Sequence, residues 1–237
     1  MNSKIDFIIR LATEADKICA QQICGEMEAS AKARGTGIAK RTSEYLIQKM
    51  QEGKAVIAFT SAGKWAGFCY IETWDHGKYV ANSGLLVNPD YRNSGLAKKI
   101  KEKILDLSRE KYPVAKIFGL TTGLAVMKIN SELGYKPVTY SELTNDDEFW
   151  SGCRSCVNYP ILLNKERKNC LCTAMLYNPA SETKVNIRNE NSEDFKDRPK
   201  IYKRFIQIKQ QLILNTGSKK EEKKIKTFTG WLAFLFG

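Results

Sequence analysis

The sequence has little of what would place it in a membrane, outside the cell or on a single-stranded nucleic acid. No apolar run approaches the roughly 20 residues of a membrane-spanning helix, and residues 1–16 lack the apolar stretch of a secretory signal. Basic and aromatic residues are not interleaved as in proteins that bind single strands. We therefore expect a cytoplasmic protein.

Histidine is scarce as well. The one histidine, His76, precedes Gly77 in a segment typical of a hairpin turn. We therefore interpret it as a turn residue in preference to a catalytic residue. The seven cysteines have no export signal beside them, which favours reduced thiols or a metal site over disulfides.

Positive charge is what the sequence has in excess. A net charge of +12 over 237 residues indicates an anionic partner such as a phosphorylated cofactor, an acidic metabolite, a nucleic acid or a membrane surface. The excess is concentrated, because residues 195–226 contain eleven Lys and Arg against three Asp and Glu. The charge therefore describes mainly a tail behind a mildly basic domain.

Hydrophobic periodicity predicts an α/β fold with a mixed sheet. We expect strands at residues 5–9, 54–59, 65–73, 79–87, 116–122 and 135–143, and helices at residues 13–33, 42–51, 95–109 and 125–133. The composition divides the chain into a domain at 1–146, a Cys-rich segment at 147–180 and a basic helical tail at 181–237, with helical spacing at 199–214.

The most informative segment is a turn between a strand and a basic helix, Arg92-Asn93-Ser94-Gly95-Leu96-Ala97. The first N–H groups of a helix have no intrahelical partner and lie at the positive end of its dipole, so they bind anions. Gly95 lets the backbone approach a phosphate, and Arg92 adds a charged donor. An ordinary strand-turn-helix is the alternative, so the motif needs its context.

That context is a family resemblance. The turn, with Val87-x-Pro89-x-Tyr91-Arg92 before it, resembles motif A of the GNAT family of N-acetyltransferases, and Gly134-Tyr135 resembles their motif B. Over about residues 5–144 the resemblance implies a GNAT-type acyl-CoA N-acyltransferase fold, a mixed central sheet flanked by helices, here with a small Cys-rich C-terminal appendage. It implies acetyl-CoA or another acyl-CoA as co-substrate. The backbone from Asn93 to Ala97 would hold the CoA pyrophosphate, and the strand at Leu85, Leu86 and Val87 would pair with the pantetheine arm.

A second resemblance concerns the acyl acceptor. Residues 117–125 and 37–44 are similar to stretches in the acetyltransferase domain of N-acetylglutamate synthases. The resemblance implies an amino acid such as glutamate, in arginine biosynthesis. Departures from the family, such as Val126 to Asn130 before Gly134, leave the donor open between acetyl and a larger acyl group such as succinyl. Arg41 or Lys40 could bind a carboxylate, with Arg41 offering bidentate geometry. Thr121 and Thr122 could donate hydroxyl hydrogen bonds. A protein, an amino sugar and a polyamine stay open as acceptors.

Direct acyl transfer needs a neutral amine, so a base must accept its proton directly or through water. Candidates on the central strands are Glu72, Asn82 and Ser83. Burial in its apolar strand would raise the pKa of Glu72, and an outward-facing residue is the alternative. Relatives place an acidic Tyr where this sequence has Asn130, which cannot act as an acid. Either another residue such as Tyr135 protonates the thiolate, or the thiolate leaves unaided.

The segment after residue 147 carries a cysteine array, Cys153-x-x-Cys156 and Cys170-x-Cys172. Four thiolates at this spacing can bind one tetrahedral zinc ion in a structural role. Four thiols without metal, or a redox pair, are the alternatives. Together with the basic tail, such a module also fits a zinc-containing nucleic-acid-binding protein, an alternative from another class.

The basic tail leaves several partners open. Its helical segment would pack on the domain or on a second copy in a homodimer. The aromatic end at residues 228–236 is too short to span a membrane. It would dock in a groove of the same protein or lie weakly on an anionic membrane surface. The main partner we expect is a small-molecule amine substrate.

Overall fold

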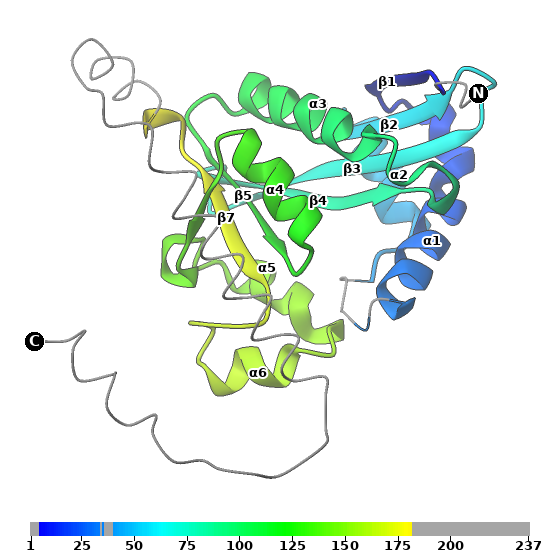
Figure 1. Cartoon of the computed structure of the whole chain (residues 1–237). Helices are drawn as coiled ribbons and strands as arrows, with labels where there is room; N and C mark the ends of the chain where they lie inside the picture. Colours follow the sequence, from blue (N-terminus) through cyan, green and yellow to red (C-terminus); the bar gives the residue numbers. More distant parts are fainter. Residues whose placement is uncertain (1–4, 34, 36–39, 182–237) are drawn as a thin grey trace, which may run out of the picture. The chain divides into compact units, whose positions relative to one another are not determined.

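The computed structural model describes residues 5–33, 35 and 40–181 of the chain (Figure 1). A central sheet forms the core of this part. Its seven strands in this part have the order β1-β2-β3-β4-β5-β7-β6. The strands are β1 (Phe7–Leu11), β2 (Ala55–Thr60), β3 (Trp65–Trp74), β4 (Tyr79–Val87), β5 (Lys116–Thr121), β6 (Lys136–Val138) and β7 (Thr173–Tyr177). The α-helices are α1 (Ala20–Ala33), α2 (Ser43–Gln51), α3 (Leu96–Lys111), α4 (Leu124–Glu132), α5 (Asp147–Ser151) and α6 (Tyr159–Asn164).

The strand directions confirm the predicted mixed sheet. Strands β1 to β4 form an antiparallel meander. Helix α3 then crosses over, so that β5 lies parallel to β4. Strand β7 is antiparallel to both of its neighbours, β5 and β6. One parallel pair in an otherwise antiparallel sheet is therefore the feature that distinguishes the centre of this fold.

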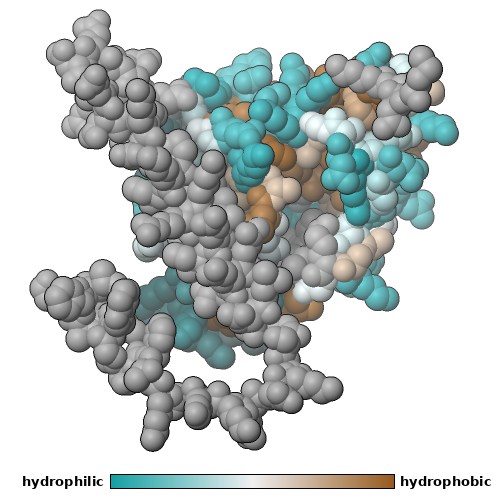
Figure 2. All heavy atoms as spheres, viewed as in Figure 1, coloured by the Kyte–Doolittle hydropathy of each residue, from teal (hydrophilic) through white to brown (hydrophobic). Residues whose placement is uncertain are grey.

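Helices cover both faces of the sheet (Figure 1). On one face, α3 and α4 bury Ile100 and Met127 against Val80 and Ile117. The opposite face is shared between α1 and α2, over β2 and β3, and the segment containing α5 and α6, over β5 and β7. Because successive strand residues point to opposite faces, each inner strand contributes side chains to both cores. Figure 2 shows that hydrophilic side chains cover much of the viewed face of the described part.

Local hydrogen bonds shift several predicted boundaries. The helix predicted from residue 13 starts as a 3-10 helix at Glu14–Cys19 before α1. There the carboxylate of Asp16 accepts from the Thr13 N–H at 2.8 Å and from the Arg10 guanidinium at 2.7 Å. The strand predicted at residues 135–143 is limited to β6, because the chain turns into a 3-10 helix at Tyr140–Glu142.

The boundary predicted between residues 146 and 147 does not separate two structural units. After β6 the chain forms α5, a 3-10 helix η4 (Gly152–Ser155) and α6, and it returns as β7 between β5 and β6. Residues 147–180 therefore complete the central sheet and are not an appendage. No local pattern marked β7, because its partners come from distant parts of the chain.

The predicted basic tail lies outside the described residues, apart from Ser181. The same is true of the helix predicted at 199–214 and of the aromatic end at 228–236. The homodimer and the membrane-surface contact stay predictions. Among the described residues, no helix has both the length and the apolar character needed to cross a bilayer.

Candidate active site

The sheet opens between β4 and β5. Their pairing ends at Ala81↔Phe118, although β4 continues to Val87. Strand β5 stays paired on its other side with β7 as far as Thr121. From Asn82 to Val87, the edge of β4 that faces β5 therefore has no strand partner among the described residues. An extended ligand can pair with such an edge.

A β-bulge at Gly84 helps β4 to bend away. The register between β3 and β4 shifts between Phe68 and Tyr70, and Gly84 has a φ of 64°. A Cβ atom at Gly84 would lie 2.4 Å from Cε1 of Tyr70. Any side chain would have to displace the strand or the ring, so a glycine is required where the two strands separate.

The predicted pyrophosphate turn lies at the far end of the same strand. A 3-10 turn at Pro89–Tyr91 follows β4, and α3 begins with Gly95 as its N-cap. Asn93 and Gly95 are both left-handed, with φ of 62° and 80°, and such residues help to gather N–H groups into an anion-binding concavity. A Cβ atom at Gly95 would meet no atom within 4 Å. The space beside this backbone is open, as the predicted role of Asn93, Ser94, Gly95, Leu96 and Ala97 requires.

Arg92 does not extend beside that backbone. Its guanidinium donates to Ser30 Oγ at 2.8 Å and to Glu26 Oε1 at 3.1 Å, both on α1. Its Nε lies 3.4 Å from the carbonyl oxygen of Val87. In this structure Arg92 ties the turn to α1, and the predicted phosphate contact would need it to change partners.

The strand residues predicted to accompany the pantetheine arm are held by packing. Leu85 and Val87 pack against the core beneath α3, while Leu86 is buried on the opposite face. With the side chains committed to the two cores, the backbone groups of β4 are what an extended ligand can reach.

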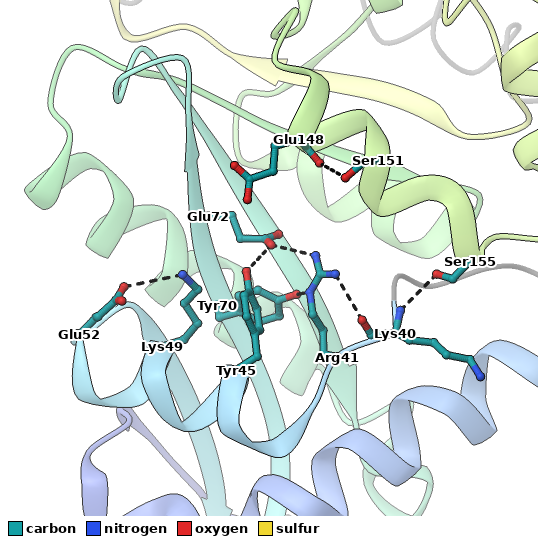
Figure 3. Close-up of polar contacts among 10 residues, drawn as sticks. All are labelled: Lys40, Arg41, Tyr45, Lys49, Glu52, Tyr70, Glu72, Glu148, Ser151 and Ser155. Carbon is teal, nitrogen blue, oxygen red and sulfur yellow. Dashed lines mark hydrogen bonds and ion pairs between the residues drawn. The ribbon is translucent and has the colours of Figure 1, made fainter.

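Beside the split, the structure brings two predicted site residues together in an ion pair (Figure 3). The Arg41 guanidinium donates from Nη2 to Glu72 Oε1 at 2.8 Å and from Nε to the Tyr70 hydroxyl at 2.9 Å. The Tyr45 hydroxyl donates to the same Oε1 at 2.5 Å. The side chain of Glu72 is 6% exposed and that of Arg41 is 18% exposed. We call these four residues the Arg41–Glu72 cluster.

The protonation of the cluster follows from its contacts. Burial would lower the pKa of Arg41, but Tyr70 and Glu72 outweigh it and raise that pKa, so the guanidinium stays charged. Burial and the Glu72 carboxylate raise the pKa of Tyr45, so its hydroxyl stays a donor. Both donors to Glu72 end on Oε1. This leaves Oε2 as the oxygen that can receive a proton from a substrate.

The segment that contains α5 and η4 lies on the other side of the Arg41–Glu72 cluster. The Lys40 N–H donates to Ser155 Oγ at 3.3 Å, which joins the loop before α2 to η4. Cys153, also on η4, lies close enough to Arg41 for the guanidinium to lower its pKa in part. Glu148 extends from α5 on the side of Glu72 (Figure 3). Two segments more than a hundred residues apart in sequence thus flank the Arg41–Glu72 cluster.

Asn82 belongs to a buried network on the opposite face of β4. Its Nδ2 donates to Ser108 Oγ at 2.8 Å, and its Oδ1 accepts from the Tyr135 hydroxyl at 2.7 Å. Nζ of Lys101 lies 3.4 Å from the same Oδ1. Burial raises the pKa of Tyr135 well above its usual value. Tyr135 therefore stays protonated and directs its proton at Asn82.

Asn130 lies close to the point where the strands separate. It is 1% exposed, and its Oδ1 has no hydrogen-bond partner among the described residues. Its Nδ2 would be 4.0 Å from a Cβ atom built on Gly119, just beyond the last β4–β5 pair. An unpaired buried carbonyl oxygen is costly, which marks Asn130 as a candidate site residue.

The remaining predicted residues make local contacts. The main-chain oxygen of Ser83 lies 3.3 Å from Cys69 Sγ, which can donate to it. Thr121 Oγ1 accepts from the Gly123 N–H at 3.0 Å, the local bond of a strand end. Thr122 is half-buried beside it. Their predicted substrate and catalytic roles stay predictions.

The zinc prediction is not supported. The four cysteines, Cys153, Cys156, Cys170 and Cys172, do line one small cavity. Within the described part of the chain, however, no group of three or more His, Cys, Asp or Glu side chains is placed to hold a metal ion. Burial, with Cys156 and Cys170 nearby, raises the pKa of Cys153 to about 11, so this thiol stays protonated. Packing of Trp150 and Leu162 against the sheet orders the segment instead.

Sequence reasoning missed Tyr45, Tyr70, Lys101 and Ser155. Tyr45 lies four residues after Arg41, a spacing that places two side chains close together. This was the one signal available for it. Ser155 meets Lys40 across 115 residues of sequence, and nothing local marks such a contact.

The split sheet, the glycine-capped turn and the flanking helices together define a class of protein. Residues 52–126 match the model of the acetyltransferase (GNAT) family, a stretch that runs from the end of α2 into α4 and contains both the split and the turn. The matched stretch is therefore a GNAT acetyltransferase domain, which indicates an acyl-CoA-dependent N-acyltransferase. No curated protein matches the sequence.

Solved structures share the fold at low identity. N-acetylglutamate synthase from Neisseria gonorrhoeae, complexed with coenzyme A and N-acetyl-glutamate, is 17% identical with a TM-score of 0.52, over 74% of this chain and 36% of that one. Rv2747 from Mycobacterium tuberculosis, complexed with CoA, is 17% identical with a TM-score of 0.52, over 72% of this chain and 98% of that one. A GNAT-family acetyltransferase from Staphylococcus aureus is 14% identical with a TM-score of 0.51, over 73% and 99%. This chain spans about a third of the length of the gonococcal synthase.

Proposed function

We propose that this protein transfers an acyl group, acetyl or succinyl, from acyl-CoA to the amino group of a small α-amino acid such as glutamate. The observation that carries the proposal is the position of Arg41 beside the split. It is a charged and largely buried guanidinium on the face opposite α3. The structural likeness to N-acetylglutamate synthase supports the same acceptor class.

Arg41 has one side left for a substrate carboxylate. Its Nε and Nη2 are used by Tyr70 and Glu72, while among the described residues Nη1 has only a long contact of 3.4 Å to the Lys40 carbonyl oxygen. A carboxylate on the Nη1 side would add a charge-assisted hydrogen bond. The acceptor would then lie between α2 and η4, with its amino group directed toward the split.

Glu72 is the group best placed to take the ammonium proton. Its Oε2 is not used by the two donors that hold Oε1. The proton can pass to Oε2 directly or through a water molecule. The neutral amine then attacks the thioester carbon, the C–N bond forms and the C–S bond breaks. The electron pair of the C–S bond leaves with the sulfur, and the second proton of the attacking nitrogen passes to water, which leaves a neutral amide.

A polyamine is the second candidate acceptor, favoured by a separate cavity. Asp75, Asp146 and Glu148 contribute to its lining together with Trp74 and His76. Carboxylates at that position would suit a second cationic group on the acceptor. The nucleic-acid-binding alternative combined a zinc module, which the described residues do not support, with a basic tail that lies outside them.

The experiment is thiol release from acetyl-CoA and succinyl-CoA by the full chain, over α-amino acids, polyamines and amino sugars. We expect the highest kcat/KM for an amino acid with a second carboxylate. Arg41→Met should raise the KM of that acceptor and leave the CoA Kd unchanged, with Lys40→Met as the matched control. Turnover of polyamines alone would select the second acceptor class. Absence of both turnover and CoA binding would overturn the proposal.

A further inference from the structure

A lysine is buried directly behind the split in the sheet, and the proposed chemistry does not use it. Lys101 lies on α3 and is 2% exposed. Its Nζ is 3.4 Å from Asn82 Oδ1 and 5.0 Å from the centre of the Tyr135 ring. Among the described residues Lys101 forms no ion pair. Lysine is almost never fully buried without a partner of opposite charge, so its presence needs an explanation.

The network around Lys101 ends at the point where β4 leaves β5. Asn82 is the first residue of β4 beyond the last pair, Ala81↔Phe118. Its side chain is held by Ser108 and Tyr135 in addition to Lys101. The ammonium group is therefore fixed one residue from the opening, on the face covered by α3, while the Arg41–Glu72 cluster lies on the other face.

A coenzyme held by the turn would bring its sulfur close to this point. From Val87 to Asn82, β4 extends about 16 Å, at the usual rise of a strand. A ligand that starts at the turn and follows the free edge of β4 reaches the split with its far end. The thioester would then lie between the ammonium of Lys101 and the acceptor site.

Of the two described residues considered as acids, neither is placed to protonate the departing thiolate. Asn130 carries an amide, which is not an acid. Tyr135 donates its proton to Asn82 at 2.7 Å and is itself buried. The sulfur must therefore leave as an anion or wait for water, and a fixed positive charge nearby would lower the barrier.

We propose that Lys101 is a positioning residue whose buried ammonium, held at Asn82, stabilises the coenzyme thiolate across β4. The inference rests on the proposed function. Charges interact more strongly across the protein interior than in water. Burying an unpaired ammonium destabilises a fold, and a destabilising charge is commonly found where function uses it.

The groups that face Lys101 are neutral around pH 7. From β3, Cys69 approaches it, and burial raises the pKa of this thiol to about 11. Tyr135 faces it after α4, and the Tyr177 ring of β7 packs against Tyr135 in a tilted arrangement, with 5.7 Å between ring centres. Burial lowers the pKa of Lys101, which Cys69 opposes in part. As the pH rises through that lowered pKa, the ammonium loses its charge, and its effect on the thiolate is lost as well.

The test compares Lys101→Met with Lys103→Met, an exposed lysine on the same helix, in the full chain. The first measurement is the pKa of the thiol of bound CoA, from the ultraviolet absorbance of the thiolate. We expect it to lie below that of free CoA in the native protein. It should rise by about one unit in Lys101→Met, a tenfold change in ionisation. Lys103→Met should match the native protein.

The second measurement is the pH profile of thiol release. We expect Lys101→Met to lower kcat about tenfold without changing the KM for acyl-CoA, because the interaction exists only as the sulfur becomes anionic. The native kcat should decline at alkaline pH as Lys101 deprotonates, and this decline should be absent from the methionine variant. A residue that only fills the core would not affect either readout.

The outcomes separate the two proposals. If Lys101→Met gains stability and keeps the native kcat, thiol pKa and pH profile, Lys101 is a packing residue and the inference is overturned. If the variant does not fold, the native titration decides, since an unshifted thiol pKa overturns the inference by itself. If the native protein binds CoA but transfers no acyl group, or does not bind it at all, the proposed function fails and this inference fails with it.

Discussion

The two ends of the candidate site are built in opposite ways. At the phosphate end, the residues from Arg92 to Ala97 are consecutive, and the groups offered to a ligand are backbone N–H groups at the start of α3. At the acceptor end, Arg41, Tyr45 and Glu72 meet through side chains that come from two separate segments of the chain.

The difference shows which contacts determine the free energy of binding or folding at each end of the site. Backbone groups at a helix start bind anions with little help from the rest of the fold. A largely buried ion pair depends on every contact that holds its partners, because an unpaired charge left inside is strongly destabilising. Substitutions should therefore separate the two ends, one by ligand affinity and the other by stability and acceptor binding.

The largest effect should come from removing one member of the ion pair. Glu72→Ala leaves Arg41 without its counter-charge at a site where the side chain is only 18% exposed. We expect the free energy of unfolding in urea to fall by about 3 kcal/mol. The double variant Arg41→Met/Glu72→Met is the control and should lose less, since no charge is stranded. An unchanged unfolding curve for Glu72→Ala would contradict the pair.

At the phosphate end, Gly95→Val should weaken CoA binding and leave the fold in place. Valine at a φ of 80° is strained, and its side chain would fill the open space beside the backbone. Loss of two charge-assisted hydrogen bonds corresponds to about a hundredfold rise in Kd, measured by calorimetry. Gly63→Val, with a φ of 76° and open space, is the matched control for backbone strain. Equal CoA affinity in both variants would disprove the role of the turn.

A smaller effect is expected where the two flanking segments meet. Ser155→Ala removes the acceptor of the Lys40 N–H. A loss of about 1 kcal/mol corresponds to roughly a fivefold rise in acceptor KM, with the CoA Kd unchanged. Ser151→Ala removes a hydrogen bond within α5 and should leave the acceptor KM unaltered. The prediction fails if the two serine variants behave alike.

The smallest effect should come from Arg92→Met. Its guanidinium is half-exposed and bound to Glu26 and Ser30. Such an ion pair contributes at most about 1 kcal/mol, so we expect a rise in CoA Kd of about fivefold or less. A loss as large as that of Gly95→Val would mean that Arg92 leaves α1 and contacts the phosphates when CoA binds.

The order of elements from residue 5 to residue 134 was predictable because local patterns carry it. Strand alternation, helical spacing and turn residues placed β2, β3, β4 and α3 within one or two residues of their observed bounds. The turn was predictable for the same reason, since a glycine at a helix start is a local signal. Arg41 and Glu72 were each singled out, yet nothing in the sequence predicted that they form one ion pair.

The place of the cysteine segment in the fold, by contrast, could not be predicted from local sequence patterns. Its spacing matched a zinc site, whereas the structure uses it to bring β7 into the sheet and η4 beside Arg41. Lys101 was equally hidden, because it belongs to a helix rich in exposed lysines. Its burial depends on how α3 rests on β4.

The sequence by itself therefore determined the class of this protein and the conformation of the turn from Arg92 to Ala97, since both depend on backbone conformations that neighbouring residues impose. Only the tertiary structure decided the Arg41–Glu72 pair, the place of the cysteine segment and the burial of Lys101. Each of these is a meeting of side chains from distant segments, and its free energy exists only once the sheet has brought them together.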